Sequence, residues 1–142
     1  MEESLSWIVY RKLRHVHYKT KKEVRNKLAQ EGITWPQFHA LYHIGEEDGI
    51  TTKKLAEKLN CNASNMTGII DRMEENNWVY RQQSEDDRRI WIIKLTQEGE
   101  DFRNKLIPMH HKNIKEYMGI LSEQELLTLA EILDKLLERE AR

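Results

Sequence analysis

The chain has 142 residues, of which 33% are charged and 39% hydrophobic, a length and balance typical of one globular domain with a hydrated surface. Its net charge of −1 conceals a gradient. Residues 1–31 carry eight basic and four acidic side chains, whereas residues 122–142 carry three basic and six acidic ones. Residues 51–96 are almost neutral, so net charge alone does not identify a nucleic-acid-binding protein.

Several classes of protein are disfavoured by what the sequence lacks. Cys61 is the only cysteine, so an intramolecular disulfide is excluded and a reducing compartment is expected. The N-terminus has no secretory signal pattern, and no apolar run reaches membrane-spanning length. Glycine-rich phosphate loops, Gly-x-Ser-x-Gly and His-Glu-x-x-His are missing. We therefore expect a cytoplasmic protein that is not an enzyme and has no cofactor.

The first predicted elements are two helices. Apolar residues recur at helical spacing over residues 5–28, and Gly32 ends that long helix. The sequence TWPQ then opens the second helix. Thr34 and Gln37 have the spacing of a capping box, and Pro36 occupies the first turn, where proline is tolerated.

Two shorter helices follow. Thr51 or Thr52 begins one, and Asn62 caps another that continues to about Asn76. The second of these has an apolar face at the helical spacing i, i+3, i+4, i+7, formed by Met66, Ile69, Ile70 and Met73. Two short helices joined by a brief turn form a helix-turn-helix candidate.

A hairpin and two further helices complete the chain. Strands are predicted at residues 78–83 and 90–95, on either side of the charged connection SEDDRR. Thr96 caps the next helix, which Pro108 should kink or interrupt because its ring lacks an amide hydrogen and clashes with the preceding turn. Ser122 begins the last helix with a capping box.

This order of elements predicts a mainly α (α+β) fold, a winged helix-turn-helix with long helices on both sides. We expect a single domain over residues 1–142. Within it, residues 34–96 form the winged lobe, and residues 1–31 and 97–142 form the flanking helical regions.

The helix-turn-helix and the hairpin both suggest contacts with DNA. The second helix of such a motif places its N-terminal residues against base edges in the major groove, where asparagine pairs with adenine. Arg88 and Arg89 at the hairpin tip suit a minor groove, whose negative potential attracts arginine, and Asp86 or Asp87 would hold one guanidinium. The alternatives are a capped surface helix and a charged turn in water.

A resemblance favours the DNA-binding interpretation. The stretch IIDRMEENNWVYRQQSEDDRRIWIIKLTQEG resembles the signature of the MarR family of bacterial and archaeal transcription regulators. The matching motifs are Asp71-Arg72, Trp78 to Arg81, Asp87-Arg88-Arg89, and Leu95-Thr96 to Gly99. ITWPQFHAL resembles the second helix of that family, and the order of elements matches over essentially the whole chain.

The resemblance implies a homodimer whose first and last helices intertwine. Its two lobes would bind a pseudo-palindromic operator in double-stranded DNA, most often as a repressor released by a small-molecule or other effector. Arg89 would enter the minor groove, oriented by Asp87, and Asp71 and Arg72 would brace the recognition helix against the wing. Gly68 departs from the family, because many relatives carry an arginine or another long side chain there. The residues expected at the DNA are Asn62, Ala63, Ser64, Asn65, Thr67, Gly68, Arg72, Asp87, Arg88 and Arg89.

Histidines and the single cysteine offer further candidates. His39 and His43 are four residues apart, the spacing of two ligands on one helix, and His110 and His111 are adjacent. Some relatives sense zinc with histidines from these helices, but no complete ligand set is evident, so we expect no metal. Cys61 is either a small packed residue or an oxidant sensor.

A small-molecule pocket is a weaker hypothesis, since aromatic residues at helical spacing are more often core. Its candidate residues are Trp7, Tyr10, Trp35, Phe38, His39 and Tyr42. Two alternatives to an effector-released repressor remain. One is a zinc-responsive regulator, and the other is a protein-binding winged helix without DNA function, which the near-neutral charge of residues 51–96 supports best.

Overall fold

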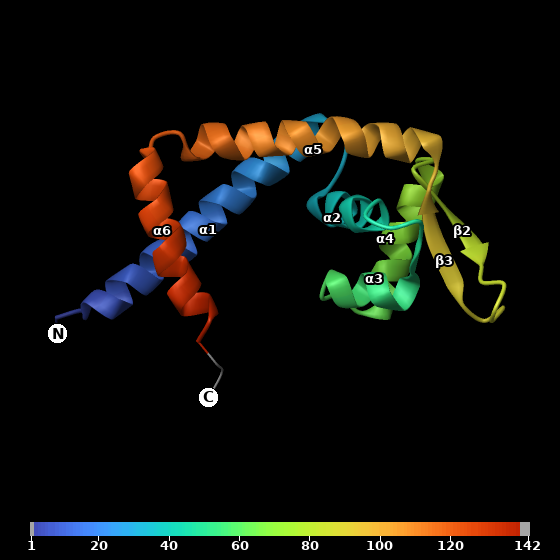
Figure 1. The fold of residues 1–142 in the computed structure, drawn as a ribbon, viewed down its shortest axis with the longest axis horizontal. Coiled ribbons are helices and arrows are strands. Elements are labelled where there is room, and N and C mark those ends of the chain that lie inside the picture. The colour runs from blue at the N-terminus through green and yellow to red at the C-terminus, as the bar shows by residue number, and fades with distance from the viewer. Residues whose placement is uncertain (1, 140–142) are drawn as a thin grey trace.

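The computed structural model describes residues 2–139. Met1 and residues 140–142, which belong to the predicted flanking regions, lie outside the described residues. In Figure 1 a compact lobe lies at one end of the molecule, and the start of the first helix and the whole of the last helix lie towards the other end. The elements follow in chain order: α1 (Leu5–Gln30), α2 (Trp35–Ile44), β1 (Ile50–Thr51), α3 (Thr52–Lys58), α4 (Ala63–Glu75), β2 (Val79–Gln83), β3 (Trp91–Leu95), α5 (Gln97–Met118) and α6 (Glu123–Leu137).

Each helix begins at a side-chain cap. A hydroxyl or amide oxygen accepts a hydrogen bond from a free amide of the first turn, which would otherwise lack a partner. The capping boxes predicted at Thr34 and Ser122 are both present. The capping residues are Ser4, Thr34, Thr51, Asn62, Thr96 and Ser122.

The lobe contains a three-stranded antiparallel sheet in the order β1-β3-β2. β2 and β3 form the predicted hairpin, in register from Val79 opposite Leu95 to Gln83 opposite Trp91. The remaining strand, β1, pairs Ile50 with Ile93 and was not predicted from the sequence. Its two residues are too few to show the alternation by which a strand is recognised.

The hydrophobic core lies between α2, α3, α4 and the sheet, and α1 and α5 close it. α1 contributes the C-terminal part of its length through Val24 and Leu28, and α5 contributes Leu106. The largest fully buried side chains are Leu28, Leu41, Ile44, Leu55, Met66, Ile70, Met73, Val79, Ile93 and Leu106. The predicted winged helix is therefore confirmed, with the apolar face of α4 turned into this core.

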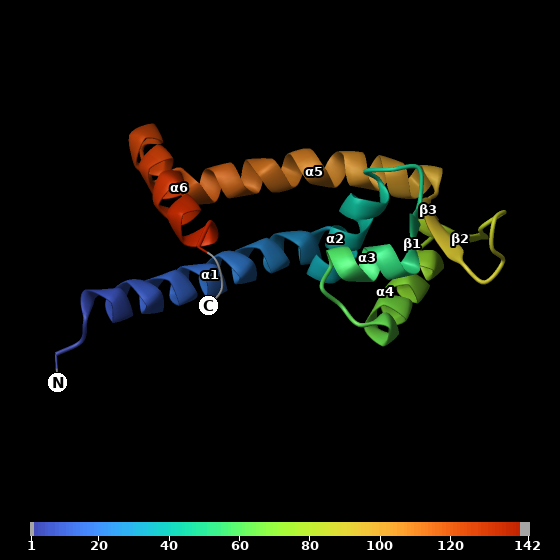
Figure 2. The same cartoon turned by 60° about the horizontal axis from the view of Figure 1, so that its bottom comes forward.

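The N-terminal half of α1 and all of α6 extend away from the lobe, as Figure 1 and Figure 2 both show. None of residues 123–137, all of which the structure describes, is buried. Apolar side chains nevertheless line both segments: Leu5, Val9, Leu13, Val16, Leu126, Leu127, Leu129, Ile132, Leu136 and Leu137. In the described part of the chain, no helix is both long and apolar enough to cross a membrane.

α5 continues through Pro108 without a break, so of the kink or interruption predicted there, the interruption is wrong. Proline removes one hydrogen bond from a helix and crowds the preceding turn. Here Leu106 is buried just before the proline, and Ile107 and Ile114 pack against the core beside it. This packing stabilises the continuous helix despite the local cost.

Candidate nucleic-acid interface

The packing of α4 determines which of its residues face outward. Met66, Ile70 and Met73 are buried, and because they recur every three or four residues, one side of the helix is fixed against the core. The opposite side is left to solvent at the N-terminal end of the helix. The exposed residues there are Ala63, Ser64, Asn65 and Thr67.

Internal hydrogen bonds divide these residues into two groups. The side chain of Asn62 accepts from the amide of Asn65 at 2.8 Å, and the hydroxyl of Thr67 donates to the carbonyl of Ala63 at 2.9 Å. The side chains of Ser64 and Asn65 make no hydrogen bond to any residue within 2–139. Ser64 and Asn65 therefore keep their side-chain donors and acceptors available for an external partner.

Arg81 on β2 connects the hairpin to α4. Its guanidinium donates to Asp71 at 2.6 Å and to Glu74 at 2.9 Å. The resemblance assigns this brace to Asp71 and Arg72, but the side chain of Arg72 instead lines a hollow beside α2. Glu74 was missed, although its i+3 spacing from Asp71 places both carboxylates on one side of the helix.

At the hairpin tip, the side chain of Arg89 is held in one orientation by Asp87. Its Nε and Nη2 atoms donate to the two carboxylate oxygens of Asp87, each at 3.1 Å, and its backbone amide donates to the same carboxylate at 3.0 Å. The side chain of Arg89 is nonetheless 90% exposed. Hydrogen bonding to Arg89 lowers the pKa of Asp87, so the carboxylate stays ionised and oriented. Of the two acids that the sequence offered for this contact, the structure uses Asp87.

The junction between α4, β2 and α5 explains the glycine of the Leu-Thr-x-x-Gly motif. The hydroxyl of Thr96 donates to the carbonyl of Asn77 at 2.6 Å, and its amide donates to the carbonyl of Trp78 at 3.0 Å. A Cβ atom on Gly99 would lie 1.9 Å from that carbonyl oxygen of Trp78. Only glycine allows α5 to begin this close to the lobe.

A second group of residues lies between the start of α3 and the wing. This group was not predicted from the sequence. Thr52 and Lys53 line a hollow of about 450 Å³ together with Thr67, Arg81 and Arg89. Positive and hydroxyl-bearing side chains at such a site are typical donors to phosphate oxygens of a DNA backbone. Their sequence positions gave little signal, because α3, α4, β2 and the hairpin tip bring them together.

Comparison with known proteins agrees with this geometry. Residues 33–91, which include α2 to the first residue of β3, match the model of the MarR family. The transcriptional repressor MprA of Escherichia coli is 32% identical over 120 residues, which cover 82% of this chain and 68% of MprA. The chain belongs to the MarR family.

Solved structures extend the similarity to nearly the whole MarR-family chain. AbsC, a MarR family transcriptional regulator from Streptomyces coelicolor, shares the fold with a TM-score of 0.84 at 23% identity, covering 97% of this chain and 96% of AbsC. A mutant of MarR from E. coli, solved in complex with operator DNA, gives a TM-score of 0.80 at 25% identity. That match covers 95% of this chain and 99% of the mutant.

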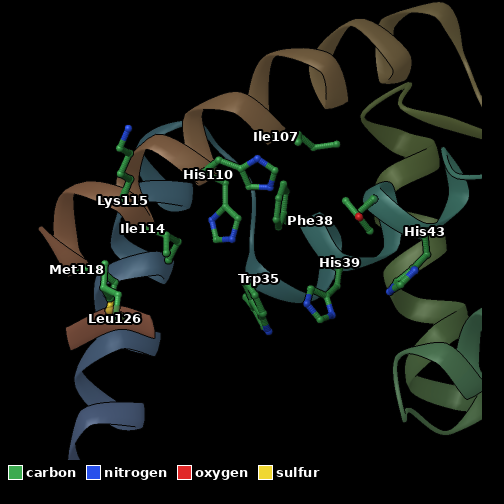
Figure 3. A pocket seen from close by; sticks show the side chains of 12 residues that line it. Trp35, Phe38, His39, His43, Ile107, His110, Ile114, Lys115, Met118 and Leu126 are labelled. Atoms are coloured by element: carbon green, nitrogen blue, oxygen red, sulfur yellow. The ribbon is translucent and has the colours of Figure 1, made fainter. Parts of the chain in front are cut away.

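A hollow of about 620 Å³ lies between α2, α5 and the start of α6 in this MarR-family chain. Figure 3 shows Trp35, His39 and His43 of α2 on one side and His110 and Ile114 of α5 on another. Four of the predicted ligand-pocket residues, Trp35, Phe38, His39 and Tyr42, line it. Trp7 and Tyr10 lie elsewhere, in the first turns of α1, with ring centroids 5.6 Å apart.

The four histidines singled out in the sequence all line this hollow. Burial lowers the pKa of His39, and nearby His43 and His110 lower it further; burial and His111 lower the pKa of His110. His43 is instead paired with Glu46 at 2.6 Å. Among residues 2–139 no group of three or more His, Cys, Asp or Glu side chains is arranged to hold a metal ion.

Cys61 occupies the turn before α4. Its thiol is half-buried against the core and donates to the carbonyl of Asn62 at 3.4 Å. This position fits a small packed residue next to the recognition helix. The oxidant-sensing role stays a prediction.

Proposed function

We propose that this protein acts as a homodimeric repressor that binds a pseudo-palindromic operator in double-stranded DNA, in the cytoplasm. It is a DNA-binding transcriptional regulator of the MarR family. The observation that carries the proposal is the pairing of a recognition helix with unused polar side chains and a wing arginine clasped by Asp87. This pairing also disfavours a protein-binding module without DNA function, which has no need of an oriented wing arginine.

The proposed contacts follow the two grooves of DNA. The start of α4 would meet base edges in the major groove through Ser64 and Asn65, with Asn62, Ala63, Thr67, Gly68 and Arg72 at the same surface. Arg89, held by Asp87, would enter the minor groove, with Arg88 beside it at the tip. Thr52 and Lys53 are added as phosphate contacts.

The exposed apolar faces of α1 and α6 support the dimer. The exposed apolar side chains of these helices, among them Leu129 and Ile132 on α6 and Leu13 on α1, would be costly to leave in water. A second copy with the same two helices would cover it symmetrically. We accordingly propose that residues 34–96 form the DNA-binding lobe and that residues 1–31 and 97–142 form the dimerisation region.

The hollow beside α2 is proposed as the effector site. Phe38, Trp35 and Ile107 supply apolar walls, and histidines supply polar groups, a combination usual for small-molecule sites. Because α2 belongs to the lobe while α5 and α6 lead into the proposed dimerisation region, a bound molecule would favour one spacing of the two lobes over others. It would release DNA only if it binds that spacing more tightly.

The direct test is binding to duplex DNA from the region upstream of the protein's own coding sequence. We expect tight binding to this duplex, far weaker binding to a scrambled duplex, and an affinity that falls steeply as salt rises. Weak and equal binding to both duplexes at every salt concentration would contradict the proposal.

A further inference from the structure

Gly68 lies in the middle of α4, where the fold gives no reason for glycine. Glycine is the poorest helix former after proline, because it loses the most backbone freedom when the helix forms. Gly68 is not among the residues with positive φ, which within residues 2–139 include only Gly32 and Gly49 among the glycines. Its backbone conformation therefore suits any residue.

Packing does not require the glycine either. A Cβ atom built on Gly68 would meet no atom within 4 Å among the described residues. The contrast with Gly99, where a Cβ atom would overlap the carbonyl oxygen of Trp78, is complete. An alanine at position 68 would make a better helix at no steric cost to the chain itself.

The open side of Gly68 faces the proposed DNA surface. Ser64 is four residues before it and Asn65 three residues before it, so all three lie on one side of α4. They border a hollow of about 600 Å³ between α4 and the start of α2. Part of its wall is apolar, formed by Trp35, Pro36, Leu59 and Ile69.

We propose that Gly68 is a specificity-determining residue whose bare backbone admits the 5-methyl group of a thymine in the operator. The inference rests on the proposed DNA-binding function and deepens it. The major-groove edge of thymine carries this methyl group, and apolar contact is how proteins usually recognise it. Asn65, with its side chain available on the same side of α4, is placed to read an adenine in the same half-site.

A side chain at position 68 would occupy the space that the methyl group needs. The backbone fixes the position of a Cβ atom, and among the described residues nothing lies within 4 Å of it. The atom would therefore stand between the helix backbone and the base pair. The glycine thus lets α4 approach the base edges more closely than a longer residue would. It also removes the contact that a long side chain would make, so the preferred base pair changes.

The test begins with a duplex selected by the wild-type protein from a random-sequence library. Its affinity is measured for wild type, Gly68→Ala and Gly68→Ser, together with thermal unfolding of each protein. Glu75→Ala serves as the control, since this exposed residue lies on the same helix in its last turn. In parallel, each thymine of the selected half-site is replaced by deoxyuridine, which lacks only the methyl group.

We expect Gly68→Ala to unfold at a higher temperature than wild type and to bind the duplex about tenfold or more weakly. Glu75→Ala should not weaken binding. At one thymine position, the same in both half-sites, deoxyuridine should weaken wild-type binding by about fourfold per buried methyl group. The same substitution should not weaken the binding of Gly68→Ala any further.

Two results would overturn the inference while leaving the proposed function intact. One is binding of Gly68→Ala and Gly68→Ser to the selected duplex as tightly as wild type. The other is wild-type binding that no deoxyuridine substitution changes, a result that does not depend on any variant folding. Failure of the wild type to select any duplex would instead remove the proposed function, and the inference with it.

Discussion

The lobe and the outer helices, which are the N-terminal half of α1 and all of α6, differ in where their apolar side chains lie. In the lobe, Leu41, Leu55 and Ile70 are fully buried within one chain. On α6, Ile132 is 51% exposed and Leu137 is 80% exposed, and no residue between 123 and 137 in this described helix is buried. The lobe's core is completed by α1 and α5 of its own chain, whereas the outer helices lack a covering surface.

This difference suggests one role for the lobe, contact with DNA, and another for the outer helices, pairing with a second chain. A packed lobe can hold Arg81, Asp71 and the hairpin in a fixed relation, which reading DNA requires. In the proposed dimer, the outer helices would set how the two lobes are spaced, because the same faces of a second chain would cover them. Substitutions in the lobe and in the outer helices should therefore reduce DNA affinity or stability to different extents. The largest loss of DNA affinity should come from the outer helices.

Separating the two chains should cost the most DNA affinity. A double substitution on α6, Leu129→Glu with Ile132→Glu, would place two charges in the proposed interface, where they cannot be hydrated. We expect a folded monomer whose affinity for the full operator falls by a factor on the order of 10² to 10⁴, because the second half-site is no longer tethered. Sedimentation and DNA titration measure the two effects.

Thr128→Glu supplies the matched control on α6. Thr128 lies between Gln124 and Glu131 on the polar side of the helix, where an added carboxylate stays in water. The control should remain dimeric and bind DNA normally. A double variant that stays dimeric would show that α6 is not in the interface.

Disrupting the contact between the start of α5 and the lobe should destabilise the fold. Gly99→Ala would force a Cβ atom to within 1.9 Å of the carbonyl oxygen of Trp78, a rigid backbone atom. We expect a loss of about 3 kcal/mol in the free energy of unfolding, near the upper end for overpacking. Urea unfolding measures it. Gly68→Ala should instead raise the free energy of unfolding. Equal changes at both positions would contradict the steric difference between the two glycines.

Removing the wing arginine should affect DNA binding alone. Arg89→Ala should weaken operator binding by about 1–3 kcal/mol and leave dimerisation unchanged. Its side chain is highly exposed, so the loss reflects an external contact rather than packing. Arg88→Ala is the companion variant, and a smaller loss is expected because Arg88 has no carboxylate clasp within the described residues. Unchanged affinity of Arg89→Ala would refute the wing assignment.

Acid should loosen the contact between α2 and α5, the smallest of these effects. The pKa values of His39 and His110 are lowered in the folded chain, mainly by burial. Between the lowered values and the ordinary value of about 6.5, the unfolded chain binds more protons, so stability falls as pH falls. His43, which pairs with Glu46, and His111 and Lys115 also line the hollow.

The corresponding measurement is urea unfolding of wild type and of the double variant His39→Gln, His110→Gln, from about pH 5 to 7.5. The variant should lose part of the decline on acidification. An identical decline in both proteins would assign the acid sensitivity to other groups.

Local signals in the sequence predicted most of the fold. Caps such as Thr34 and Asn62, the apolar face of α4 and the hairpin are all short-range patterns, and the structure confirms them. β1 was missed because two residues are too few to show the alternation of a strand. A kink or interruption was predicted at Pro108 because the packing around α5 cannot be read from the sequence. Non-local packing accounts for both differences.

The candidate site was predictable where its residues are close in sequence. Asp87 and Arg89 are two residues apart, and their clasp is present as expected. The contact of Arg81 with Glu74 and the hollow that brings Lys53 towards Arg89 depend on how separate elements pack. The free space at Gly68 likewise becomes visible only once its neighbours are placed.

Binding to a single half-site tests whether two lobes, joined through their outer helices, read the two halves of the operator together. The protein would be titrated against a full selected duplex and against a duplex of equal length that retains one half-site. We predict two chains per full duplex, and an affinity for the half-site duplex that is lower by a factor on the order of 10². Binding of one chain per duplex, with equal affinity for the full and the half-site duplex, would contradict the binding of two lobes to two half-sites.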